Sequence, residues 1–273
     1  MNYTVETIKY ILKNFLYVIL FAFIPGLFFS FTISENAVVS VVTNLFSGTP
    51  KDSFWNIFQT VSIFNFSSAE SILFGFFGVV ASVICIAMLT AFLEKHMRIG
   101  KRTLNGLISK VNDNLLSTCG YILLCLVIYE VWAVLIAALC YFVTLIPNVV
   151  VVYALLAIVY IGMHFVLLYV LSIFYLWLPC LQITGFRSFE ALRYSYQLIA
   201  PIQTRLVFRQ LAFLLICEGL IGASVVLISG TIASFAAATV LYTAMILVYC
   251  IRMLVVYFDR AQIDRADLKK YFA

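Results

Sequence analysis

Residues 149–181 read VVVVYALLAIVYIGMHFVLLYVLSIFYLWLPCL, an apolar run without a single Asp, Glu, Lys or Arg. A helix that crosses a bilayer needs about 20 such residues, because its side chains face hydrocarbon instead of water. The whole chain has the same character: 64% of its 273 residues are hydrophobic and only 11% are charged. Soluble domains carry about 25% charged residues. The sequence therefore predicts an all-α, polytopic membrane helix bundle.

Six apolar runs are long enough to span a bilayer, and they form a single integral membrane domain, residues 1–273. The predicted spans are residues 15–33, 71–93, 115–146, 149–181, 206–228 and 231–258. The third and fourth are longer than a bilayer requires, so they must tilt, kink or project.

The outer loop, residues 34–70, is the longest segment between two spans. Phe54, Trp55, Phe58 and Phe64 recur in it at helical spacing, which predicts a short helix resting on the outer leaflet. A re-entrant segment and a cap over the bundle are the alternatives.

The distribution of positive charge predicts the orientation of the chain. With the N-terminus in the cytoplasm, every one of the 17 Lys and Arg residues except Lys51 falls on the cytoplasmic side. Basic residues in short loops are retained on that side during insertion. Both termini are therefore expected in the cytoplasm, and an odd number of spans would destroy this asymmetry.

Basic, amphipathic segments precede the first, third and fifth spans. Such a segment forms a helix in the membrane interface, with its apolar face toward acyl chains and its cations toward headgroups. The sequence thus predicts three units, each an amphipathic interfacial helix followed by a helical hairpin. The apolar positions are Ile8, Ile11, Leu12 and Phe15, then Leu104, Leu107, Ile108, Val111 and Leu115, then Phe186, Phe189, Leu192, Tyr196 and Ile199.

Three ionisable side chains fall near the middle of predicted spans: Glu130, His164 and Glu218. An uncompensated charge at the bilayer centre costs at least about 2.5–3.5 kcal/mol, so each must be neutral, face the bundle interior or find a partner. The functional interpretation is a midplane polar site that binds a proton, an ion or a substrate. The alternative is a buried polar clasp that fixes helix register.

Seven arginines and lysines near the cytoplasmic ends of the spans form a predicted basic collar. Each well-placed cation attracts anionic lipid by about 1 kcal/mol. Nucleic-acid binding is disfavoured, because the basic residues flank hydrophobic spans. The candidate lipid-headgroup contacts are Arg98, Lys101, Arg102, Arg193, Arg205, Arg209 and Arg252.

Catalytic, metal and cofactor sites are not predicted. The seven cysteines lie in apolar runs without a C-x-x-C pair, which is typical of small buried residues. Histidine and carboxylate residues show no metal-ligand spacing, and there is no G-x-S-x-G or H-E-x-x-H motif.

Residues 186–196, FRSFEALRYSY, lead into the basic start of the fifth span. This element resembles one found in a group of bacterial six-span membrane proteins related to the membrane domain fused to some glycerophosphodiester phosphodiesterases. The resemblance implies a membrane fold in the bacterial inner membrane. It does not imply the enzyme's activity, because the soluble catalytic domain has no counterpart in this sequence.

Three classes of function are compatible with these features. We expect a non-catalytic accessory or scaffold protein that interacts with anionic lipid and with a partner membrane protein or a second copy. The alternative is a small transporter or permease component that uses Glu130, His164 and Glu218. An intramembrane enzyme is the least favoured class.

Overall fold

The computed structural model describes residues 2–48, 50–102, 104–228 and 232–268. Within these ranges the chain is helical and contains no β-strand. Its α-helices are α1 (Tyr3–Ser30), α2 (Glu35–Phe46), α3 (Phe54–Val61), α4 (Ala69–Ile99), α5 (Leu107–Thr144), α6 (Val149–Ile173), α7 (Trp177–Thr184), α8 (Ser188–Ile199), α9 (Gln203–Leu227) and α10 (Ile232–Arg260).

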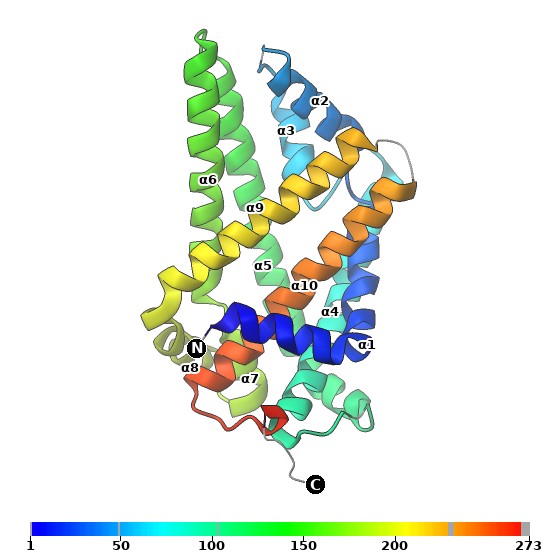
Figure 1. The fold of residues 1–273 in the computed structure, drawn as a ribbon, viewed down its shortest axis with the longest axis vertical. Helices are drawn as coiled ribbons and strands as arrows, with labels where there is room; N and C mark the ends of the chain where they lie inside the picture. The colour runs from blue at the N-terminus through cyan, green and yellow to red at the C-terminus, as the bar shows by residue number, and fades with distance from the viewer. Residues whose placement is uncertain (1, 49, 103, 229–231, 269–273) are drawn as a thin grey trace.

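Six helical segments are long and apolar enough to cross a membrane, which confirms the predicted all-α polytopic bundle. They are Tyr3–Ser30, Ala69–Ile99, Leu107–Thr144, Val149–Thr184, Ser188–Leu227 and Ile232–Arg260. Helix α1 begins and α10 ends at the same end of the bundle, the lower end in Figure 1. An even number of crossings requires this arrangement.

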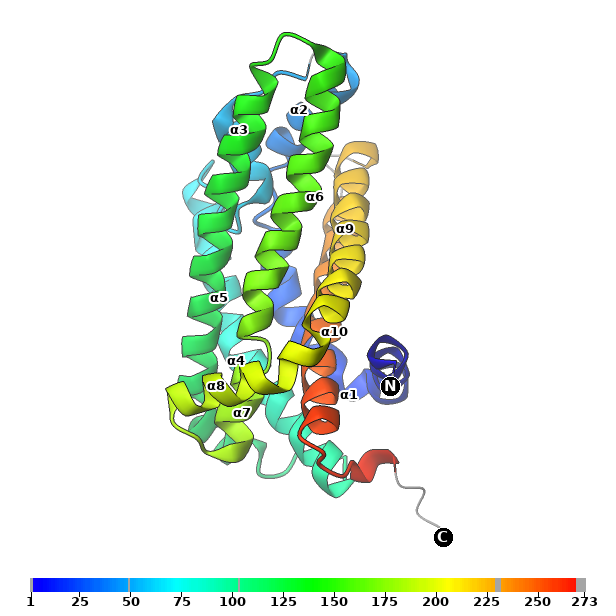
Figure 2. The ribbon, with the colours of Figure 1, turned by 90° about the vertical axis from the view of Figure 1, so that its left-hand side faces the viewer.

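The spans are arranged in a tight group and a projecting hairpin. Helix α1 packs against α10 and α4, and helix α9 runs obliquely between α6 and α10. The α5–α6 hairpin extends beyond the other spans at the upper end of the molecule (Figures 1 and 2). The main core lies at the lower end, where the last turns of α10 are enclosed and Met253 and Val256 have no exposed surface.

Helix α1 is bent, and its close packing on α10 depends on a glycine. The bend is at Asn14, whose backbone is non-helical and whose side-chain amide donates to the Tyr10 carbonyl, 3.0 Å away. Farther along, a Cβ atom on Gly26 would lie 2.7 Å from Thr243 Oγ1. Only a residue without a side chain allows the two backbones this approach.

The three predicted interfacial segments fold differently from one another. The first is the part of α1 before the bend, and the third is the separate helix α8. The second differs from the prediction, because α5 runs without a break from Leu107 to Thr144 and includes that segment in its first turns. Their contact with headgroups stays a prediction.

The segment 34–70 contains two helices, where one was predicted. Helix α2 packs against α3 and α9, and α3 packs against α5. The pair thus connects the α5–α6 hairpin with α9 (Figure 1). The position of these helices relative to the outer leaflet stays a prediction.

Candidate functional site

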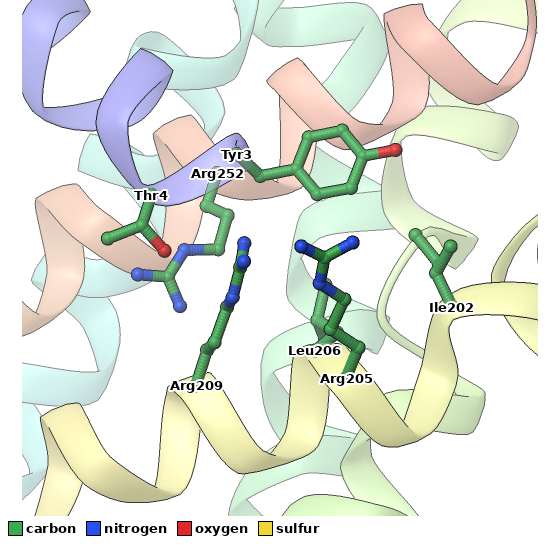
Figure 3. Close-up of a pocket in the computed structure, with 7 residues that line it drawn as sticks. All are labelled: Tyr3, Thr4, Ile202, Arg205, Leu206, Arg209 and Arg252. Carbon is green, nitrogen blue, oxygen red and sulfur yellow. The ribbon is translucent and has the colours of Figure 1, made fainter. Parts of the chain in front are cut away.

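Three of the predicted headgroup contacts converge on one small pocket near the lower end of the bundle. Arg205 and Arg209 lie one turn apart on α9, and Arg252 projects toward them from α10 (Figure 3). The first turn of α1 closes the third side with Tyr3 and Thr4. No carboxylate is among the described residues that line this pocket.

Arg252 is the most unusual member of the pocket. The residue is only 3% exposed, and its Nε has no hydrogen-bond partner among the described residues. A buried charge that lacks a counter-ion costs several kcal/mol, on the order of the penalty for leaving half of a buried ion pair. The pocket therefore carries excess positive potential that a bound anion would neutralise.

The rest of the pocket is held in place by contacts from the N-terminal segment. Arg209 Nη1 donates to Asn2 Oδ1 at 3.1 Å, and the Tyr3 hydroxyl donates to Asp259 Oδ2 at 2.6 Å. These bonds fix the start of α1 against α9 and α10. The enclosed volume is about 10 Å³, which is room for about one water molecule. A single anion oxygen fits inside, with the remainder of the anion at the mouth.

The other four predicted headgroup contacts lie outside the pocket. Arg98, at the end of α4, pairs with Glu94 through Nη1 and Oε1 at 3.1 Å. Lys101 and Arg102 are exposed in the connection between α4 and α5, and Arg193 is exposed on α8.

Two of the three predicted midplane residues meet. His164 Nε2 of α6 lies 2.9 Å from Glu218 Oε2 of α9, and the same oxygen accepts a 2.7 Å hydrogen bond from the Tyr160 hydroxyl. His164 is 1% exposed as a side chain, whereas Glu218 is 24% exposed. The Trp132 ring stands edge-on to the imidazole at 4.7 Å. This arrangement encloses the histidine and leaves the carboxylate partly open.

The contacts of His164 show where its protons lie. Its Nδ1 is 2.8 Å from the Tyr160 carbonyl oxygen, which can only accept, so Nδ1 carries a hydrogen. The 2.9 Å contact between Nε2 and the carboxylate then requires a second proton, on either group, because two lone pairs would repel. The ring is not aligned for a hydrogen bond at Nε2, so the contact is an ion pair or a shared proton with poor directionality.

Glu130 is separated from this pair and has a different role. Its Oε2 accepts from Ser62 Oγ and its Oε1 accepts from the Ile63 backbone N–H, both at 2.9 Å. The neighbouring Tyr129 hydroxyl donates to the Val61 carbonyl at 2.7 Å. Consecutive residues of α5 thus hold the C-terminal end of α3, in what we call the Tyr129–Glu130 clamp.

No family model matches this chain, and no curated protein or solved structure matches it. The structure brings together no group of three or more His, Cys, Asp or Glu side chains suited to a metal ion within the described ranges. The residues that the N-terminal segment contributes, Asn2, Tyr3 and Thr4, precede the first predicted span, 15–33. They were not predicted, because nothing in their local pattern indicates contact with α9.

Proposed function

We propose that this chain is a non-catalytic accessory or scaffold protein of the cell membrane that binds an anionic lipid headgroup at the arginine pocket. The bound lipid would connect it to a partner membrane complex or to a second copy. The six spans support membrane residence. The charge asymmetry supports cytoplasmic termini, and the resemblance of residues 186–196 supports the bacterial inner membrane.

The observation that carries this proposal is the buried Arg252, whose Nε has no hydrogen-bond partner among the described residues. Arginine binds phosphate through two parallel N–H···O contacts, and it is weakly hydrated, so it suits a partly buried anion site. Arg205 and Arg209 stand beside Arg252 and add charge at the pocket mouth. A phospholipid phosphate supplies an oxygen for the cavity and acyl chains for the surrounding apolar helix faces.

Native mass spectrometry in a non-ionic detergent tests this proposal directly. The wild-type protein is expected to retain phosphatidylglycerol in preference to phosphatidylcholine. At about 1 kcal/mol per cation, the double variant Arg209→Gln/Arg252→Gln should bind phosphatidylglycerol about 30-fold more weakly.

The matched control is Lys101→Gln/Arg193→Gln, which removes the same charge from exposed positions outside the pocket. At 0.15 M salt it should retain most of the preference, because salt screens exposed cations far more than the buried Arg252. An equal loss in both variants would show that the lipid responds to the general basic collar, and the pocket proposal would fail.

The second candidate is a small transporter component, and the His164–Glu218 contact favours it. A histidine and a partly open carboxylate in contact within two spans resemble the Asp, Glu and His residues that relay protons in pumps and transporters. Glu130 does not join this pair, and neither the arginine pocket nor the cleft described below includes any of the three residues.

Proton entry into liposomes, driven by a potassium diffusion potential, separates this candidate from the clasp alternative. Transport predicts a flux in the wild type that Glu218→Gln abolishes and Glu190→Gln, at an exposed position on α8, does not. If purified wild-type protein admits no protons, the pair is a structural clasp.

A further inference from the structure

A second cavity lies at the opposite end of the bundle from the arginine pocket. It is a cleft of about 600 Å³, formed where α2, α3 and the first turns of α4 and α10 meet. Small-molecule sites in proteins have volumes of about 300–1,000 Å³. The cleft is therefore large enough for a small organic ligand.

The lining of this cleft is negatively charged. Glu35 and Glu70 are its two carboxylates, and neither Lys nor Arg is among its described lining residues. Each carboxylate stands in the first turn of a helix, Glu35 in α2 and Glu70 in α4. Ser234 Oγ donates to Glu35 Oε1 at 3.3 Å and anchors that side chain against α10.

Two amide side chains give an independent indication of a ligand. Gln59 is 8% exposed and Asn65 is 3% exposed, and both line the cleft. The Asn65 oxygen accepts from the Ser67 N–H at 2.9 Å. Its NH₂ group and the whole Gln59 amide have no hydrogen-bond partner within the described part of the chain. Neither amide is among the enclosed unpaired groups of the described residues, so these free polar groups face the open cleft, where a polar ligand can pair with them.

An aromatic cluster forms the remaining wall. The Phe31 ring lies 5.0 Å from that of Phe74 and 5.7 Å from that of Phe235, measured between centroids. Aromatic faces attract organic cations through the ring quadrupole. The cleft has only two carboxylates, and no group of three or more His, Cys, Asp or Glu side chains suited to a metal ion occurs among the described residues.

We propose that the cleft binds a small, soluble organic ammonium ion. Its charged nitrogen lies between the two carboxylates, its carbon atoms contact the phenylalanines, and its polar substituents pair with the Gln59 and Asn65 amides. This site is separate from the arginine pocket, so either proposal can fail without the other.

Isothermal titration calorimetry of the whole protein in a polyoxyethylene detergent tests the proposal. Choline and ethanolamine are the probes, and glucose and Ca²⁺ are the neutral and metal comparisons. Both ammonium compounds are expected to bind more tightly than either comparison. Glu70→Gln, at an exposed position, should weaken ammonium binding about tenfold, and Glu35→Gln should do the same.

Asp113→Asn is the matched control, because Asp113 is an exposed carboxylate on α5 that does not line the cleft. It should leave the affinity for choline within about twofold, with folding checked by thermal melting. The proposal is overturned if glucose or Ca²⁺ binds more tightly than the ammonium compounds, if no probe binds, or if Glu70→Gln and Asp113→Asn have the same effect.

Discussion

Removing the carboxylate of Glu130 should allow the segment that connects α3 and α4 to open locally while the helix bundle stays folded. The carboxylate accepts two hydrogen bonds of 2.9 Å, from Ser62 Oγ and from the Ile63 N–H. A hydrogen bond to a charged group contributes about 1.5–3 kcal/mol. Because Ser62 Oγ also donates to the Phe64 carbonyl, we take the lower value for each bond. Glu130→Ala should therefore lower the free energy of local opening by about 3 kcal/mol.

Hydrogen–deuterium exchange, read by mass spectrometry in peptides that cover residues 61–68, measures this opening. A loss of about 3 kcal/mol corresponds to exchange that is about 100-fold faster. Glu130→Gln keeps an oxygen for the Ile63 N–H and should accelerate exchange only about tenfold. Tyr129→Phe removes one neutral bond, to Val61, and should have an effect of about fivefold.

Asp113→Asn is the control for this series, because Asp113 is an exposed carboxylate on the same helix, α5. Its exchange pattern should match that of the wild type. Unchanged exchange in Glu130→Ala would show that the clamp does not hold the segment. Faster exchange throughout α10 would show global destabilisation and would equally refute the local account.

Three further predictions concern packing, topology and the two buried basic residues, His164 and Arg252. Gly26→Ala should destabilise the protein by about 1–3 kcal/mol through its clash with α10, whereas Gly222→Ala, with open space around its Cβ position, should be neutral or stabilising by thermal melting. Cysteine introduced at position 101 should react with an impermeant maleimide only in inverted vesicles. Cysteine introduced at position 51 should react only in intact cells. Labelling of both positions from one side of the membrane would exclude the proposed topology. In lipid-free detergent, Glu218→Gln should lower the melting temperature, because it removes the partner of His164. Arg252→Gln should not lower it, because no carboxylate lines the pocket around Arg252 among the described residues. The opposite order would contradict the His164–Glu218 pairing.

The six spans were predictable because hydropathy is a property of local composition. Residues 149–181 contain no charged group that needs water, so their place in a membrane follows without knowledge of their neighbours. The separate helix α8 was also predictable, because an amphipathic pattern is likewise a local property of the sequence. The continuity of α5 was not, because an amphipathic segment can precede a span with or without a break, and neither proline nor glycine stands between Leu107 and Leu115 to decide it.

The contacts of the candidate sites were only partly predictable. Position along a helix indicates depth, so Glu130, His164 and Glu218 could be placed at similar levels. Depth does not fix the direction in which each side chain points around its helix. The partner of Glu130 is a backbone N–H 67 residues away in the chain, and no sequence pattern records such a contact. The outer cleft was missed because its amides come from a segment predicted to rest on the lipid surface.

His164 and Arg252 are both buried in helices that span the bundle, but they differ in whether a carboxylate lies beside them. His164 has a carboxylate 2.9 Å away on α9, so the cost of its burial is offset within the protein. Arg252 has two further arginines beside it and no lining carboxylate among the described residues. Arginine stays protonated at any physiological pH, so it cannot become neutral as histidine can. We therefore propose that an anion from outside the chain offsets its charge, and anionic lipid phosphates are concentrated at a membrane surface.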